Sequence, residues 1–331
     1  MWFKQLQLFQ FEEALNYSFL DRLDEQLSKL AFHPCLPAMQ QSMGWVPPIE
    51  EDEVGELDPE DHTQSHGLVR SIQHYAMICL QVEEKILPAT VVRQALDEKV
   101  KQLESAEGYK MGGKRKMILK DEIMMTLLPR AFTKRTRIYA YIDIKQGWLV
   151  LGSANQKRAE QFLGLLKKSI IEAIYPVKSK NIAAKLTHWL KHQDYPNSLA
   201  IEKACMLQDP KQENRVIRCK QQDLFAQSIQ ALLKDGCEAM QLAFSWEDRI
   251  NFVINHDFSL SGIRFEDALL TEAKDRGAES PRQQFDADFL IMTEALAGLL
   301  QDLCDCLVTE SKLGSQAHET MLNQDAGVVV Q

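Results

Sequence analysis

Residues 137–151 read RIYAYIDIKQGWLVL and contain two stretches of β-forming residues on either side of a turn. Isoleucine, tyrosine, valine and tryptophan are frequent in Arg137–Ile144 and Trp148–Leu151, whereas Gln146 and Gly147 between them favour a turn. This arrangement is typical of a β-hairpin, so the sequence predicts an antiparallel sheet.

Two helices are expected immediately before this hairpin. Pro88 suits the first turn of a helix that runs to about Glu107, because its missing N–H is not needed there. After the glycine-containing break 108–113, a second helix runs from about Lys114 to Leu128 and is stopped by Pro129. Helical patterns predict further helices at 19–32, 155–171, 182–190, 223–233 (capped by Asp223) and 285–307.

Strands are expected on both sides of these helices, at 2–11, 75–82, 199–207 and 215–219, and as a three-strand meander at 239–246, 249–255 and 260–265. The run Gly44-Trp45-Val46-Pro47-Pro48 is expected to end any regular element. Hairpins mixed with helices indicate an α+β fold. We expect a central α+β domain (1–87 and 130–178), a projecting helical arm (88–129), a C-terminal α+β domain (179–310) and a flexible tail (311–331).

Composition indicates a globular, cytoplasmic protein. The 331 residues are 45% apolar and 26% charged, and no apolar run reaches the about 18 residues of a membrane span. The N-terminus lacks the pattern of a signal peptide. The seven cysteines are odd in number and form no CxxC motif, which favours a reducing compartment over a disulfide framework.

The net charge of −9 hides a strong segregation of charge along the chain. Residues 1–98 carry a net −11, residues 99–191 a net +13, and residues 192–331 a net −11. Because charges beyond a Debye length of about 8–10 Å are largely screened, the middle segment is able to attract a polyanion on its own. The alternative is that basic and acidic segments neutralise one another in the fold.

Three motifs are candidates for chemical sites. Residues 108–114 spell G-x-x-x-x-G-K, but Arg115 replaces the Ser or Thr of a nucleotide-binding loop, and a helix precedes the motif. A flexible basic turn is the better interpretation. His62 and His66 are four residues apart beside the acidic run 50–61, where a solvated loop is favoured over a zinc site.

Asp286 and Asp288 form a third candidate, a carboxylate pair for a metal-dependent nuclease. At a spacing of two they diverge by about 200° on a helix, which makes sharing one ion difficult. Helix N-terminal carboxylates that favour the macrodipole are the simpler interpretation. We therefore expect no enzyme, no metal and no cofactor, and keep a structure-specific nuclease as the alternative.

The basic segment is the strongest functional signal. Between Lys99 and Arg137 the chain has eleven Lys or Arg residues and four Asp or Glu residues. Phosphate contacts from such side chains give affinity without sequence information, and no DNA-reading motif accompanies them. Non-specific binding to the DNA backbone is therefore predicted, with a solvated face or a partner subunit as alternatives. The candidate contact residues are Lys110, Lys114, Arg115, Lys116, Lys134 and Arg135.

Several ordered blocks of the sequence resemble the RdgC family of recombination-associated proteins over residues 2 to about 307. The blocks are Trp2-Phe3-Lys4, Met43–Pro48, Glu84–Pro88, Leu128–Phe132, Val216–Arg218 with Gln222–Leu224, and Phe285–Phe289. The resemblance implies a cytoplasmic, nucleoid-associated homodimer. It implies a ring with a positively charged hole that encircles double-stranded DNA without sequence preference and restrains RecA-promoted strand exchange.

The resemblance also implies roles for individual residues. Phe132 matches an aromatic residue at a dimer contact that closes the ring, although a core position is the alternative for this residue type. A basic stretch implicated in DNA contact corresponds to 218–223 here, so Arg218, Lys220 and Gln222 are further candidates. Gln221 stands where relatives can carry a second lysine, which removes one phosphate contact per subunit.

Overall fold

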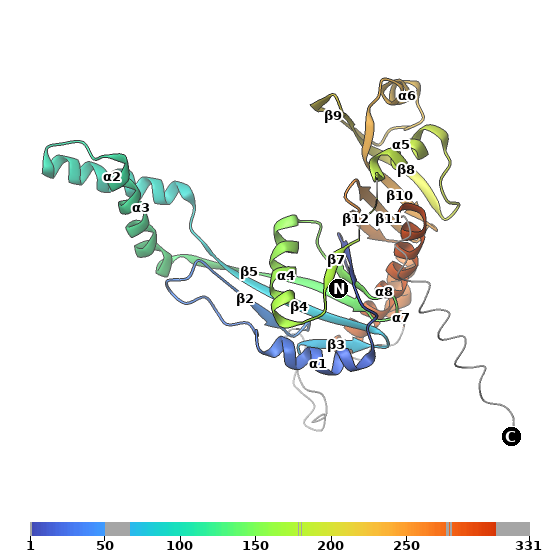
Figure 1. Cartoon of the computed structure of the whole chain (residues 1–331), viewed down its shortest axis with the longest axis horizontal. Coiled ribbons are helices and arrows are strands. Elements are labelled where there is room, and N and C mark those ends of the chain that lie inside the picture. The colour runs from blue at the N-terminus through green and yellow to red at the C-terminus, as the bar shows by residue number, and fades with distance from the viewer. Residues whose placement is uncertain are drawn as a thin grey trace. The chain divides into compact units, whose positions relative to one another are not determined.

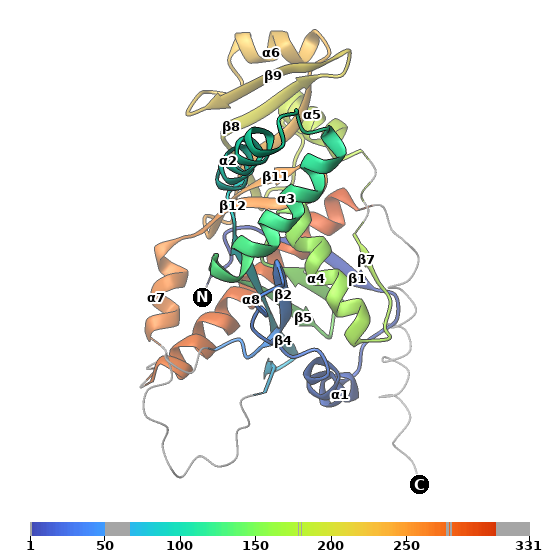
Figure 2. The same cartoon turned by 90° about the vertical axis from the view of Figure 1, so that its left-hand side faces the viewer.

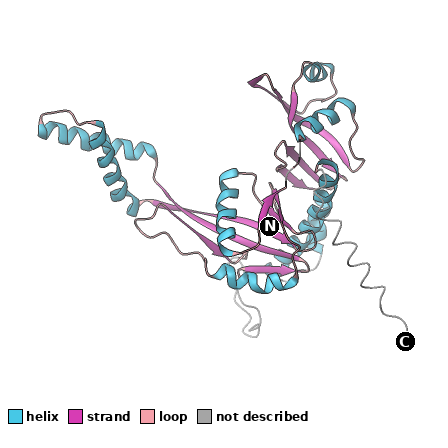
Figure 3. Ribbon diagram, viewed as in Figure 1, coloured by secondary structure: helices cyan, strands magenta, loops and turns pink. Residues whose placement is uncertain are grey.

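The computed structural model describes residues 2–49, 67–177, 179, 181–275, 278 and 280–308. The chain divides into two units, residues 1–176 with 273–290 and residues 177–272 with 291–331. The acidic run 50–61, His62, His66 and the predicted tail 311–331 lie outside the described residues. Both units combine helices with antiparallel strands (Figure 3), which confirms the predicted α+β class.

The first unit is built on a seven-stranded antiparallel sheet (Figure 1). β4 (Tyr75–Ile86) and β5 (Phe132–Asp143) pair along their whole lengths, and β5 turns into β6 (Trp148–Leu151). The predicted hairpin is therefore confirmed. The sheet is completed by β2 (Gln41–Val46) and β3 (Val69–Ile72), which pair with β4, and by β1 (Gln7–Phe11), which joins β6 to β7 (Ile174–Pro176).

Helices cover both faces of this sheet. On one face, Leu23 of α1 (Tyr17–Ser28) and Phe162 of α4 (Gln156–Ser169) share a buried cluster with alternate residues of β4 and β5. On the other face, the ring of Tyr141 lies 6.2 Å from that of Phe289, centroid to centroid, in the first part of α8 (Pro281–Leu307). Burial of both faces explains why the sequence of β4 is a nearly continuous apolar run.

β2 corrects one expectation. The run that begins at Gly44 does not end regular structure, because β2 continues through Val46 and stops only at Pro47. A Cβ atom at Gly44 would lie 2.4 Å from the Cα of Phe32, so glycine permits a close approach of two backbone segments. This approach places Ala31 in a parallel bridge with Trp45.

The second unit contains a five-stranded sheet in the order β12-β11-β10-β8-β9. Its strands are β8 (Leu199–Asp209), β9 (Gln212–Lys220), β10 (Glu238–Trp246), β11 (Ile250–Asn255) and β12 (Leu260–Phe265). The last three form the predicted meander. Trp189 of α5 (Ile182–His192) packs edge-on against Phe244 of β10, with ring centroids 5.8 Å apart.

Several predicted boundaries are wrong by a few residues. α6 spans Gln227–Lys234 and follows Ala226, whereas Asp223 accepts a hydrogen bond from the Phe225 N–H at 2.9 Å and shapes a turn before the helix. β1 begins at Gln7, where its pairing with β6 begins, and α1 ends at Ser28. α7 (Asp267–Asp275) was not predicted. None of the helices in the described ranges is long and apolar enough to cross a membrane.

Candidate nucleic-acid interface

The predicted pair of helices between β4 and β5 is present, and we call it the arm. It consists of α2 (Ala89–Glu107) and α3 (Gly113–Leu127), which pack against each other, with α3 running obliquely across Figure 2. Both helices begin and end within one residue of the predicted positions. A small apolar cluster of Val100, Met111 and Leu119 holds them together. Gly108 ends α2 in the left-handed conformation, with φ of 74°, which favours glycine.

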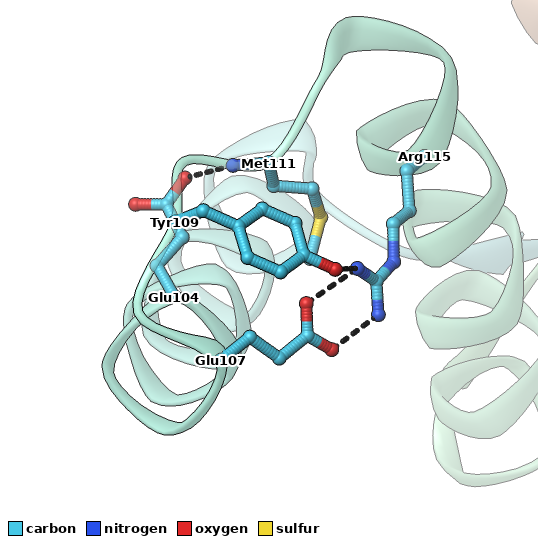
Figure 4. Close-up of polar contacts among 5 residues, drawn as sticks. All are labelled: Glu104, Glu107, Tyr109, Met111 and Arg115. Atoms are coloured by element: carbon cyan, nitrogen blue, oxygen red, sulfur yellow. Dashed lines mark hydrogen bonds and ion pairs between the residues drawn. The ribbon is translucent and has the colours of Figure 1, made fainter.

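Polar contacts cross the tip of the arm (Figure 4). The Arg115 guanidinium donates to both carboxylate oxygens of Glu107 at 2.5 Å and to the Tyr109 hydroxyl at 3.1 Å. The pKa of Glu107 is lowered, first by its hydrogen bond from Arg115 and then by Tyr109. A bidentate Arg–carboxylate pair fixes both distance and orientation, so Arg115 joins the two helices.

The G-x-x-x-x-G-K segment is the turn between α2 and α3, as its sequence context predicts. Glu104 accepts a hydrogen bond from the Met111 N–H at 2.7 Å, and the Lys116 ammonium lies 3.7 Å from the same carboxylate oxygen. A nucleotide-binding loop directs its backbone N–H groups at phosphate and follows a strand. Here a carboxylate occupies one of those N–H groups, so the turn is built differently from a phosphate-binding loop.

Arg135, near the start of β5, also has an internal partner. Its Nε donates to Glu83 Oε2 at 2.7 Å, and Glu83 accepts a second hydrogen bond from the Cys35 N–H at 2.9 Å. The Glu83 side chain is 4% exposed, and the hydrogen bond from Arg135 is the main cause of its lowered pKa. Arg135 therefore neutralises a buried carboxylate of the sheet.

The candidate cations of the first unit thus fall into two groups. Arg115, Lys116 and Arg135 are held by carboxylates of their own chain. Lys110, Lys114 and Lys134 are exposed and make no ion pair with any described residue. Sequence reasoning named all six residues but did not foresee that three of them are paired, because the pairing carboxylates come from a neighbouring helix or strand. One pairing could have been suspected from the sequence: Glu107 and Arg115 are eight residues apart on either side of the predicted turn between the two helices, which brings them close together.

Phe132 is the first residue of β5 and is 85% exposed, so it is not a core residue. It lies directly opposite Ile86 of β4, which is 49% exposed. Two large apolar side chains are therefore presented to solvent where the arm joins the sheet. Sequence reasoning missed Ile86, although the long β4–β5 pairing places it beside Phe132.

A cavity of about 440 Å³ lies at the same end of the arm. Its apolar lining includes Leu87, Val92 and Leu128, and Arg93 and Lys120 add positive charge. Residues of both α2 and α3 line the cavity, so it exists only when the two helices pack together. No local pattern of residues predicts it.

The second group of candidate DNA contacts lies in the second unit. β9 is an edge strand, and its alternation places Arg218 and Lys220 on one exposed face, with Cys219 buried on the other. Gln222 follows in the turn after β9, exposed, and its N–H donates to the Lys203 carbonyl at 3.3 Å. Neither Arg218 nor Lys220 makes an ion pair with a residue in the described part of the chain.

The carboxylate pair on α8 makes separate contacts. Both oxygens of Asp286 accept hydrogen bonds from the Arg70 guanidinium, one of them at 2.9 Å, and Asp288 accepts one from the Gln284 side chain at 2.9 Å. No group of three or more His, Cys, Asp or Glu side chains able to hold a metal ion occurs among the described residues. The contacts of Asp286 tie β3 to α8.

Sequence comparison relates nearly the whole chain to one family. The family model described as "RdgC: Putative exonuclease, RdgC" matches residues 1–310. The recombination-associated protein RdgC of Proteus mirabilis is 32% identical over 314 residues, which are 94% of this chain and 100% of that protein. The proteins of the same description from Yersinia enterocolitica and Yersinia pestis are each 33% identical over 314 residues, 94% of this chain and 99% of the relative. The chain therefore belongs to the RdgC family of recombination-associated proteins.

Proposed function

We propose that this protein binds double-stranded DNA without sequence preference, as a ring-shaped homodimer associated with the nucleoid, and thereby restrains RecA-dependent strand exchange. The observation that carries the proposal is a set of exposed cations with no described ion-pair partner in a chain whose relatives are named recombination-associated proteins. Phosphate contacts from such cations supply affinity, and closure of a ring would slow dissociation.

The proposed DNA contacts are unequal. Lys110, Lys114, Lys134, Arg218 and Lys220 are exposed and form no ion pair with a described residue, so they are available to phosphate, and Gln222 adds a neutral hydrogen-bonding group. Arg115, Lys116 and Arg135 would reach phosphate only while also holding carboxylates. We assign these three mainly to the fold.

Binding to duplexes of two unrelated sequences across a salt series tests the proposal. The logarithm of the association constant should fall linearly with the logarithm of salt concentration, equally for both sequences. Replacing Lys110, Lys114 and Lys134 together by Gln should reduce the slope by about 0.9 for each phosphate that the variant no longer neutralises. Replacing the exposed Lys4, Lys145 and Lys168 by Gln, which also make no ion pair with a described residue, is the charge-matched control. Salt-independent binding, or equal effects of the two triple variants, would contradict the proposal.

The dimer is tested at Phe132. Its exposure beside Ile86 and the arm cavity supports a role as an interface anchor. Phe132→Ala should weaken dimerisation in sedimentation experiments by about 2 kcal/mol, roughly 30-fold, while the melting temperature stays near that of the wild type. Tyr17→Ala, at another side chain that is 61% exposed, should leave dimerisation unchanged. An unaltered dimer in Phe132→Ala would exclude this contact.

A nuclease is the second candidate, because the family description contains the word exonuclease. Metal binding by Asp286 would require its carboxylate to leave Arg70. Labelled duplex and branched DNA incubated with Mg²⁺ should therefore remain intact. Cleavage that disappears in Asp286→Asn and Asp288→Asn would replace the binding proposal with the enzymatic one.

A further inference from the structure

Two cysteines face each other across β8 and β9. Cys205 and Cys219 are direct partners in the antiparallel register, and their side chains therefore share one face of the sheet. Both residues are buried, at 6% and 7% exposure, and burial and then the neighbouring Cys219 contribute to the raised pKa of the Cys205 thiol. Cα atoms of directly opposed residues lie about 4.5–5.5 Å apart, within the range of about 4.4–6.8 Å that a disulfide requires.

We propose that Cys205 and Cys219 form a reversible modification site, at which a hydroperoxide converts the two thiols into a cross-strand disulfide. One thiol attacks the peroxide oxygen and becomes a sulfenic acid, with release of water or an alcohol. The second thiol attacks that sulfur, and water leaves as the S–S bond forms. The two cysteines lose two electrons and two protons in total, and the peroxide bond is reduced.

No other cysteine pair in the described part of the chain has this geometry. Cys79 lies opposite Tyr139 and Val46, and Cys304 and Cys306 are two residues apart on a helix, where their side chains diverge. Cys35 and Cys237 belong to no cysteine pair in the strand registers. All seven cysteines are free in the structure, which corresponds to the reduced form.

The surroundings determine how readily the step occurs. Burial, followed by the neighbouring Cys219, raises the pKa of the Cys205 thiol to about 12, so little of it is thiolate at neutral pH. β9, however, is the edge strand of its sheet, and edge strands open locally at lower cost than central ones. We expect slow oxidation that accelerates as pH rises, and a product whose S–S bond joins β9 covalently to β8.

The site is independent of the proposed DNA contacts, because Arg218 and Lys220 lie on the opposite face of β9. The disulfide would nevertheless link β9, the strand that carries Arg218 and Lys220, covalently to β8. Failure of DNA binding would leave the disulfide proposal untouched, and the reverse is also true.

Peptide mapping of the full chain tests the proposal. The protein is treated with hydrogen peroxide at neutral and alkaline pH, the remaining thiols are alkylated under denaturing conditions, and peptides are analysed by mass. We expect a linked pair of peptides containing Cys205 and Cys219, lighter by two hydrogen atoms than the reduced pair and separated by dithiothreitol. The linked product should form faster at the higher pH.

Matched variants complete the test. Cys205→Ser and Cys219→Ser should each abolish the linked product, whereas Cys237→Ser, at a third buried cysteine, should leave it unchanged. Peptide mapping of the wild-type protein decides the proposal by itself, so a variant that misfolds does not weaken the result. The proposal is overturned if both thiols are still alkylated after Cys35 has been oxidised, or if each forms a sulfinic acid without linkage.

Discussion

The sheet of the first unit and the arm that extends from it are stabilised in different ways. The sheet cluster joins strands and two helices around Trp45 and Phe162, which are 1% and 0% exposed. The buried cluster of the arm contains Val100, Met111 and Leu119, and α3 leaves apolar side chains in solvent. Those side chains are Met117, Ile118 and Met125, which are 68%, 54% and 76% exposed.

The difference shows that the arm buries far fewer apolar side chains than the sheet and adds partly exposed charged contacts to them. Arg115 and Lys116 contribute to its structure through Glu107 and Glu104. A count of basic residues in the sequence therefore overstates the charge that is free to meet phosphate.

The largest effect should come from the sheet cluster. Phe162 packs edge-on against Trp45, with ring centroids 5.3 Å apart. Phe162→Ala should lower the free energy of unfolding by about 4 kcal/mol, because it removes buried area and leaves a cavity. Denaturant melts followed by tryptophan fluorescence measure this. A smaller loss than that of Leu119→Ala in the arm would show that apolar burial does not stabilise the sheet more than the arm.

Leu119→Ala should have a smaller and more local effect. Leu119 lies in the small arm cluster at 8% exposure, so we expect a cost of about 2 kcal/mol. Hydrogen exchange should accelerate in α2 and α3 and remain unchanged in β4 and β5. Met125→Ala, at an exposed position of α3, is the control and should leave exchange unaltered. Equal acceleration in the sheet would show that arm and sheet unfold together.

Glu83, a buried carboxylate of the sheet that is paired with Arg135, predicts a pH dependence. Its pKa is lowered in the folded protein, so its contribution is fully present above the ordinary glutamate pKa of about 4.3 and is lost as pH falls through the folded value. Glu83→Gln should cost about 1 kcal/mol at pH 7, and the difference from wild type should shrink below about pH 4. Thermal melts at several pH values measure it. If wild type and Glu83→Gln still differ in stability by the same amount at low pH, the ionised Glu83 carboxylate is not the cause.

The smallest effect should come from the tip of the arm. Arg115→Ala removes the exposed pair with Glu107 and should raise hydrogen exchange of the Gly108–Gly113 turn, with little change in global stability. High salt should reproduce part of the effect in the wild-type protein. Lys114→Ala, the neighbouring cation without a described ion-pair partner, should not loosen the turn. Similar hydrogen exchange in Arg115→Ala and Lys114→Ala would show that the Arg115–Glu107 pair does not stabilise the turn.

Much of the fold could be predicted from local patterns. The hairpin of β5 and β6, the two arm helices and the meander of the second sheet follow from periodicity and turn residues, which act within a few positions. The expected end of structure at Gly44 was wrong, because the reason for that glycine is the distant backbone of Phe32. The expected cap at Asp223 was wrong, because this carboxylate shapes a preceding turn.

The sequence by itself determined the α+β class, the arm and the concentration of positive charge in its middle segment, since these depend on residue type and near neighbours. Only the tertiary structure decided which of those charges are already paired, that Phe132 is exposed beside Ile86, and that Cys205 faces Cys219. Each of these involves residues far apart in the chain, such as Glu83 and Arg135, which are 52 positions apart. Strand register and helix packing bring such residues together, and local sequence patterns do not predict either of them.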